Sequence, residues 1–301
     1  MRDLLRPIAL VSALLILAVL ASCGASRLPS NEGAPGTPDK KEKSSHSKKS
    51  KKQAKDPNAL PGDETIKNPE VAYNMALEFA GQENMEAAHH YIELAIRMRT
   101  DSKYSYTQGL FYLTEGKYNE AVVHFNRAMT EGAGTQENKL AVRNALGVCY
   151  KELGKDEEAL KEFRDVVNSP GLFGRYEAYY NMGVIYMRQK KSVDAEAVFM
   201  KVVEENPNFY KAYNKLGVLA AFRNDWGSAA ISYKKALDLL SMDYNGAHVD
   251  GAEIYYNYGE ALYHEKLYPQ ARNALLQVLK ISPEGSYGRR AKEVLAQLGG
   301  N

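Results

Sequence analysis

Apolar residues between positions 69 and 285 recur with the period of an α-helix rather than with the alternation of a β-strand. Ala195, Phe199 and Val202 lie at i, i+4 and i+7, which places them on one face of a helix. The segment before them has the same kind of spacing, with Tyr179, Met182, Gly183 and Tyr186. The pattern therefore predicts two consecutive helices joined by a turn.

This helix pair occurs six times along the chain. Each copy has a small residue in its first helix, an alanine twelve positions later, and a large apolar residue four positions after the alanine. The small residues are Ala76, Gly109, Gly147, Gly183, Gly217 and Gly259, the alanines are Ala88, Ala121, Ala159, Ala195, Ala229 and Ala271, and the large residues are Ile92, Phe125, Phe163, Phe199, Tyr233 and Leu275. Because one pair cannot cover its own apolar face, we expect neighbouring pairs to stack in series.

This register resembles the tetratricopeptide repeat, a helix–turn–helix unit of about 34 residues. The resemblance implies an all-α fold, a right-handed superhelical solenoid of six tetratricopeptide helix pairs over residues 67–284. Residues 285–301 carry a single apolar stripe and are predicted to form a capping helix and tail. The two longest turns, 130–140 and 241–251, are predicted to be surface loops.

In the tetratricopeptide family the first helices line a concave groove that holds the partner. Carried onto this sequence, the groove residues are Tyr73, Asn74, Tyr106, Asn144, Tyr180, Asn181, Asn214, Tyr256 and Asn257. Tyrosine offers rigid aromatic area with a hydroxyl, and asparagine can hydrogen-bond both edges of a peptide amide. The alternative is that some of these tyrosines fill the groove wall. Lys103, Lys211 and Lys215 are too scattered to predict a lysine clamp for a terminal carboxylate.

The first residues of the chain have a different pattern. An apolar run of 14 residues, 7–20, follows Arg2 and Arg6 and leads into Ala21-Ser22-Cys23. A positive start, a short apolar run and small residues at the exit are typical of a secretory signal peptide. Leu20-Ala21-Ser22-Cys23 also resembles a bacterial lipobox, which implies removal of residues 1–22 and covalent lipid on Cys23. The alternative is a plain signal peptide with an incidental cysteine.

Residues 23–66 are rich in Pro, Gly, Ser and Lys and poor in large apolar residues, so we expect a disordered tether. Eight of its lysines lie between Lys40 and Lys55. They could make weak contact with anionic lipid or cell wall, or the tether could be a soluble spacer. By the lipobox resemblance, Gly24 after the cysteine implies a bacterial cell-envelope protein at the periplasmic face of the outer membrane.

Catalytic and metal chemistry are not predicted. Cys149 lies among packing positions, and the histidines show no metal-ligand spacing. The whole chain carries a net charge of only +2, and an exported protein does not meet nucleic acid, so no nucleic-acid partner is expected. We predict no catalytic residue, no metal and no cofactor other than the lipid on Cys23.

The leader, lipobox, tether and repeats together resemble the Tgl, PilF and PilW pilotins, which are outer-membrane lipoproteins of type IV pilus biogenesis. That resemblance implies a non-catalytic scaffold that binds secretin subunits and promotes their assembly in the outer membrane. The alternatives are an envelope adaptor that scaffolds peptidoglycan enzymes, or an adaptor in another outer-membrane complex.

Overall fold

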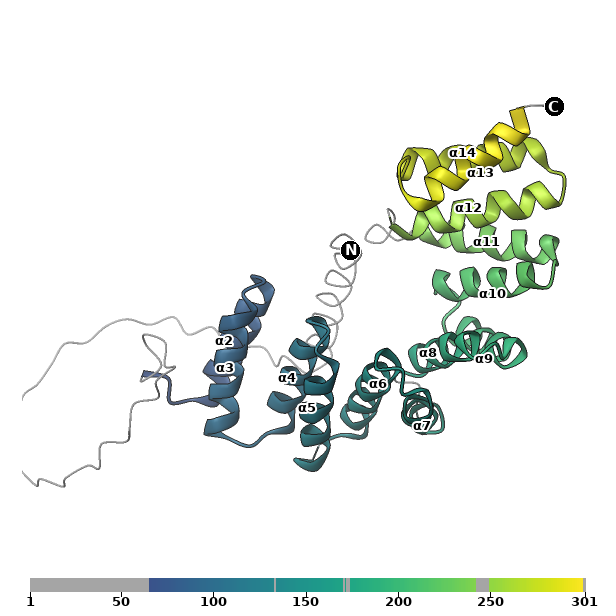
Figure 1. Cartoon of the computed structure of the whole chain (residues 1–301). Coiled ribbons are helices and arrows are strands. Elements are labelled where there is room, and N and C mark those ends of the chain that lie inside the picture. The colour runs from purple at the N-terminus through teal and green to yellow at the C-terminus, as the bar shows by residue number, and fades with distance from the viewer. Residues whose placement is uncertain (1–64, 133, 170, 172–173, 242–248, 300–301) are drawn as a thin grey trace, which may run out of the picture. The chain divides into compact units, whose positions relative to one another are not determined.

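A computed structural model describes residues 65–132, 134–169, 171, 174–241 and 249–299. The predicted signal peptide 1–22, the predicted lipid site Cys23 and the tether up to residue 64 lie outside the described residues. Within the described ranges all regular structure is helical (Figure 1). The helices are α2 (Pro69–Gly81), α3 (Met85–Met98), α4 (Ser102–Thr114), α5 (Tyr118–Thr130), α6 (Gln136–Glu152), α7 (Asp156–Val167), α8 (Arg175–Arg188), α9 (Ser192–Glu205), α10 (Tyr210–Phe222), α11 (Trp226–Leu240), α12 (Val249–His264), α13 (Tyr268–Ile281) and α14 (Ser286–Gly299).

The chain divides into two compact units at residue 100. In the described residues, unit 1 contains the pair α2/α3. Unit 2 contains the pairs α4/α5, α6/α7, α8/α9, α10/α11 and α12/α13, followed by α14. The two helices of each pair pack against each other, and within unit 2 the second helix of each pair packs against the next helix along the chain. The prediction of an all-α solenoid of helix pairs with a final capping helix is confirmed.

In the pairs of unit 2, the two helices approach closely because a glycine faces a large apolar side chain. A Cβ atom added to Gly183 would lie 2.6 Å from the Phe199 ring, and one added to Gly147 would lie 2.6 Å from Phe163. Real Cβ atoms do not come this close to a neighbour. Gly109, Gly217 and Gly259 stand in the same relation to Phe125, Tyr233 and Leu275. The small and large residues of the sequence pattern therefore form one repeated contact.

The turn inside each pair has one backbone geometry. The residue two positions before the start of the second helix has a positive φ. These residues are Glu83, Gly116, Gly154, Lys190, Asn224 and Lys266. The following backbone N–H donates to a carbonyl five residues earlier, for example Lys191 N to Tyr186 O at 2.9 Å. This is the hydrogen bond of a Schellman motif. The left-handed backbone conformation costs an L-amino acid about 1–2 kcal/mol. The turns with a non-glycine residue at this position are therefore strained relative to those with glycine.

Neighbouring pairs of unit 2 share apolar clusters. Leu140 of α6 and Phe163 of α7 belong to one buried cluster with Ile185 of α8. The final helix α14 contributes Ala291 to a cluster that includes Val278 of α13. Stacking therefore buries the faces that a single pair leaves exposed, and α14 covers the last one.

The predicted loop 130–140 is shorter in the structure, because its last five residues, 136–140, already belong to α6. Helix α6 begins at Gln136, and the Thr135 side chain accepts a hydrogen bond from Asn138 N at 3.3 Å. This N-cap gives a hydrogen-bond partner to a backbone amide at the start of the helix. The burial of Leu140 stabilises this first turn of α6. Of the second predicted loop, 241–251, residues 242–248 lie outside the described residues, and Val249 begins α12.

Candidate partner-binding surface

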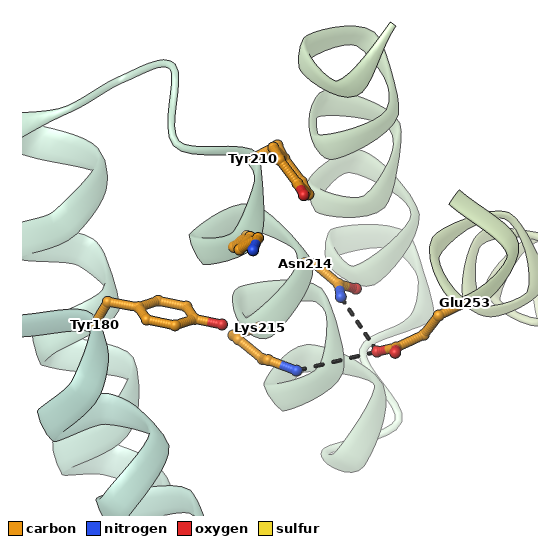
Figure 2. Close-up of a pocket in the computed structure, with 6 residues that line it drawn as sticks. Tyr180, Tyr210, Asn214, Lys215 and Glu253 are labelled. Atoms are coloured by element: carbon orange, nitrogen blue, oxygen red, sulfur yellow. Dashed lines mark hydrogen bonds and ion pairs between the residues drawn. The ribbon is translucent and has the colours of Figure 1, made fainter. Parts of the chain in front are cut away.

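A small polar hollow lies among the first helices of three successive pairs of unit 2. Its volume is about 130 Å³. Tyr180 of α8 and Glu253 of α12 form two of its walls, and α10 supplies the remaining lining residues, Tyr210, Lys211, Asn214 and Lys215 (Figure 2). Two of the predicted groove residues, Tyr180 and Asn214, are therefore brought to one site.

The helical register of α10 explains this lining. Tyr210 and Asn214 are one turn apart, as are Lys211 and Lys215, so all four side chains project from one side of the helix. Tyr210 and Asn214 are themselves buried, on the same face as the buried Gly217, whereas Ala212 and Leu219 are buried on the other side of α10. Of the three lysines that the sequence offered for a carboxylate clamp, Lys211 and Lys215 line this hollow and Lys103 does not.

Polar groups in the hollow converge on the Glu253 carboxylate. Asn214 Nδ2 donates to Glu253 Oε1 at 3.3 Å, and Lys215 Nζ lies 4.0 Å from the same oxygen (Figure 2). Asn214 is only 7% exposed, and its Oδ1 atom has no hydrogen-bond partner among the described residues. The lining thus contains two ammonium groups and one carboxylate.

The predicted asparagines of the third and fourth pairs are used inside the protein. Asn144 Nδ2 donates to the Gly174 carbonyl at 3.0 Å, which ties the start of α8 to α6. Asn181 Oδ1 accepts from Lys151 Nζ at 2.8 Å, and Asn181 Nδ2 donates to the Glu177 carbonyl at 3.0 Å. These contacts hold neighbouring pairs together, so neither amide is simply presented to a partner.

Two predicted tyrosines contribute to the groove wall. The Tyr106 ring lies 5.7 Å from the Phe125 ring, and the Tyr180 ring lies 5.7 Å from the Phe199 ring. Both tyrosines remain half-buried rather than fully covered. Each therefore packs on the core with part of its ring and keeps part of it on the surface.

Tyr256 is covered in this structure, although the same register predicted it for the groove. It is 3% exposed, with the Arg290 guanidinium 4.3 Å from its ring centre and Tyr287 beside it. Burial, and next the nearby Glu260 carboxylate, raise the pKa of Tyr256. The cause is α14, which packs where a further pair would otherwise continue the groove. Asn257, on the same helix, is half-buried.

Within unit 1, Tyr73 is half-buried and Asn74 is exposed on α2. Both are on the first helix of their pair, in the same register as the groove residues of unit 2. Their role as groove residues stays a prediction.

Comparison with known proteins identifies the repeats. Models of the tetratricopeptide repeat match residues 145–170, 176–209 and 215–286. The chain contains tetratricopeptide repeats. The matched segments extend from within α6 to the start of α14. They include Tyr180, Lys215 and Glu253 of the hollow, whereas Tyr210, Lys211 and Asn214 lie between two matches.

Solved structures with the same fold include PilW and PilF. PilW, described as a widely conserved type IV pilus biogenesis factor, has a TM-score of 0.62 and 16% identity, over 74% of this chain and 97% of that one. PilF of Pseudomonas aeruginosa has a TM-score of 0.62 and 16% identity, over 77% and 99%. The C-terminal part of a tetratricopeptide protein from Cytophaga hutchinsonii has a TM-score of 0.56 and 18% identity, over 76% and 89%. At these identities the likeness establishes the fold. No curated protein matches by sequence.

The tetratricopeptide pairs carry little reactive chemistry. In the described ranges, no three His, Cys, Asp or Glu side chains are grouped so that they could hold a metal ion. Cys149 is buried, and desolvation, followed by the nearby Glu152 carboxylate, raises the pKa of its thiol to about 12. The thiol is therefore protonated at neutral pH and is a poor nucleophile. Nor does any helix that the structure describes have the length and apolar character to cross a membrane.

Proposed function

We propose that this chain is a lipid-anchored pilotin, a non-catalytic scaffold that binds secretin subunits in the periplasm and promotes their assembly in the outer membrane for type IV pili. The observation that carries the proposal is the fold match over nearly the full lengths of PilW and PilF. The lipobox-like Leu20-Ala21-Ser22-Cys23 supports it independently, because it implies an envelope lipoprotein.

The chain's own residues would act by binding and positioning. Lipid on Cys23 would hold the protein at the membrane, since two or more acyl chains anchor firmly where one does not. Residues 24–64 would allow the repeats to reach a secretin subunit away from the bilayer. The first helices of the tetratricopeptide pairs would hold a segment of that subunit, with the polar hollow as one point of contact.

Deletion of the gene in its own bacterium tests this function. We expect loss of heat-resistant secretin multimers on a denaturing gel, and restoration by the wild-type gene. Complementation with Cys23→Ser should leave the multimers in the inner membrane, or reduce them, because the scaffold would no longer be anchored. The matched control is Ser30→Thr, which lies outside the lipobox-like tetrapeptide and keeps the cysteine. Normal secretin multimers in the deletion strain would reject the proposal.

A second function has one observation in its favour. The eight lysines between Lys40 and Lys55 suit contact with the anionic cell wall, so the repeats could scaffold peptidoglycan enzymes or another outer-membrane complex. Affinity purification from envelope extracts separates the candidates: secretin among the proteins recovered favours the pilotin, and wall hydrolases without secretin favour the adaptor.

A further inference from the structure

The turns inside the last three pairs of unit 2 expose large apolar side chains. Val193, near the start of α9, is 80% exposed, and Phe222, at the end of α10, is 77% exposed. Leu267 and Tyr268, where α13 begins, are 43% and 45% exposed. Exposed apolar side chains that gather on one part of a surface indicate a contact with a protein or a membrane.

The fold itself does not require apolar residues at these positions, because the first two pairs of unit 2 have polar residues there. In the pairs α4/α5 and α6/α7, the equivalent residues are Thr114 and Glu152 for Phe222, Asn119 and Glu157 for Val193, and Lys117 and Lys155 for Leu267. The same turn therefore forms with either kind of side chain. Packing inside the pair does not explain why the last three turns are apolar.

The three turns lie next to one another at one edge of unit 2. Arg223, in the turn between α10 and α11, donates two hydrogen bonds of 2.8 and 2.9 Å to the Glu196 carboxylate of α9. Trp226, which begins α11, stacks on His264 at the end of α12, with ring centres 3.9 Å apart. Figure 1 shows the α10/α11 and α12/α13 turns at the same end of these helices. We call this surface the apolar edge and define it as Val193, Phe222, Trp226, Leu267 and Tyr268.

The chemistry of the apolar edge suits the headgroup region of a phospholipid bilayer. Tryptophan and tyrosine are enriched where a protein meets a membrane surface, because each has an apolar ring and one polar group. Charge does not select the lipid, since Arg223 is paired with Glu196. The other charged residues of the three turns balance one another: Lys190, Lys191 and Lys266 against Asp194, Asp225 and Glu265. Such a contact would be driven by burial of apolar area.

The proposed lipid on Cys23 would bring the apolar edge close to a bilayer. Forty-one residues, 24–64, separate Cys23 from the first residue that the structure describes. A flexible chain of this length spans roughly 35 Å on average. A surface held within that distance of a membrane has a high effective concentration, so a contact that is weak by itself becomes populated.

We propose that the apolar edge inserts its side chains into the surface of a phospholipid bilayer and holds unit 2 against the membrane. The proposal rests on the proposed function only for the lipid anchor that brings the repeats to a bilayer. It goes beyond that function because the repeats themselves gain a membrane contact. This second contact would fix which side of unit 2 faces the bilayer.

The fluorescence of Trp226 tests the proposal, because Trp226 is the only tryptophan of the chain. The protein is residues 23–301 with Cys23→Ser, so that no acyl chain contributes, and the probe is vesicles of pure phosphatidylcholine. We expect the emission to shift to shorter wavelength as vesicles are added. It should be quenched when brominated phosphatidylcholine replaces the ordinary lipid. High salt should not weaken this binding, because salt screens charges and not apolar contacts.

Substitutions taken from the earlier turns assign the contact. Phe222→Thr gives α10 the residue that α4 has at this position, and it should weaken vesicle binding about tenfold, as expected when one phenylalanine is no longer buried. Leu267→Lys, which copies the turn before α7, should weaken binding severalfold. Val123→Thr is the matched control: Val123 is 64% exposed on α5, outside the apolar edge, so binding should not change. Equal circular dichroism melts confirm that the variants are folded.

Three results would overturn the proposal. The first is Trp226 emission that does not respond to phosphatidylcholine vesicles. The second is a response only to vesicles of equal parts phosphatidylcholine and phosphatidylglycerol that disappears in high salt, because this pattern assigns binding to the lysines between Lys40 and Lys55. The third is equal weakening by Phe222→Thr and Val123→Thr.

The membrane contact and the pilotin function can fail separately. If Trp226 responds as described while secretin multimers are normal in the deletion strain, the membrane contact stands and the pilotin function fails. If the multimers are lost but Trp226 does not respond to vesicles, the pilotin function stands and the membrane contact fails.

Discussion

The first helices of unit 2 have two faces that differ in how regular they are. The face toward the second helix repeats one contact, a glycine against a large side chain, from Gly109 with Phe125 to Gly259 with Leu275. The groove face changes from pair to pair. Asn144 ties α8 to α6, whereas Asn214 lines a hollow with two lysines. A repeated interior thus fixes the fold, and the opposite face of the first helices varies from pair to pair.

The largest expected effect on stability comes from removing the large side chain of the repeated contact. Phe199 is fully buried against Gly183, so Phe199→Ala should lower the free energy of unfolding by about 3–5 kcal/mol. Urea titration followed by circular dichroism measures it. The neighbouring Met200 is 54% exposed, and Met200→Ala should have an effect within about 0.5 kcal/mol. Equal urea midpoints for the two variants would contradict the claim that the repeated interior contact fixes the fold.

Filling the same contact should have a smaller effect. Gly183→Ala places a methyl group against the Phe199 ring, which must shift. We expect a loss of about 1–3 kcal/mol by the same urea assay. Gly81→Ala is the control, because nothing lies within 4 Å of its added Cβ. A gain in stability for Gly183→Ala would mean that helix propensity outweighs the close approach.

On the groove face, loss of the hydrogen bond made by Asn144 should lower the stability by a smaller amount. Asn144→Ala removes the hydrogen bond to the Gly174 carbonyl, and we expect a loss of about 1 kcal/mol. Hydrogen exchange should accelerate at the first turn of α8, where the tie acts. Asn126→Ala, at an exposed position of α5, should neither lower the stability nor accelerate exchange at α8. Unchanged exchange at α8 would show that Asn144 does not position that helix.

The smallest expected effect on stability comes from the turn that joins the two helices of a pair. Lys190 has a φ of 59°, so Lys190→Gly should raise the stability by about 0.5 kcal/mol through relief of backbone strain. The reverse change at the equivalent turn, Gly154→Lys at φ 73°, should lower it by a similar amount. Thermal melts of the two variants measure the shifts, and shifts of the same sign would exclude this account.

The sequence was sufficient to predict the helix pairs, but it did not predict where α6 begins or which side chains α14 covers. The alanine and large-residue register placed each second helix correctly. The start of α6 was missed, because the cap at Thr135 extends the helix into a stretch of polar residues. Tyr256 was assigned to the groove because its register matches that of Tyr180. Nothing in the register indicates that α14 folds back over it.

What the sequence determined by itself is the pair, because its defining contact joins residues close along the chain, such as Gly183 and Phe199, within one helix–turn–helix unit. What only the tertiary structure decided is the groove, because its contacts join different pairs. Asn214 meets Glu253, 39 residues away, and Lys151 meets Asn181, 30 residues away. Such contacts depend on how successive pairs stack, and the period of the apolar residues within a pair does not specify which polar side chains that stacking brings together.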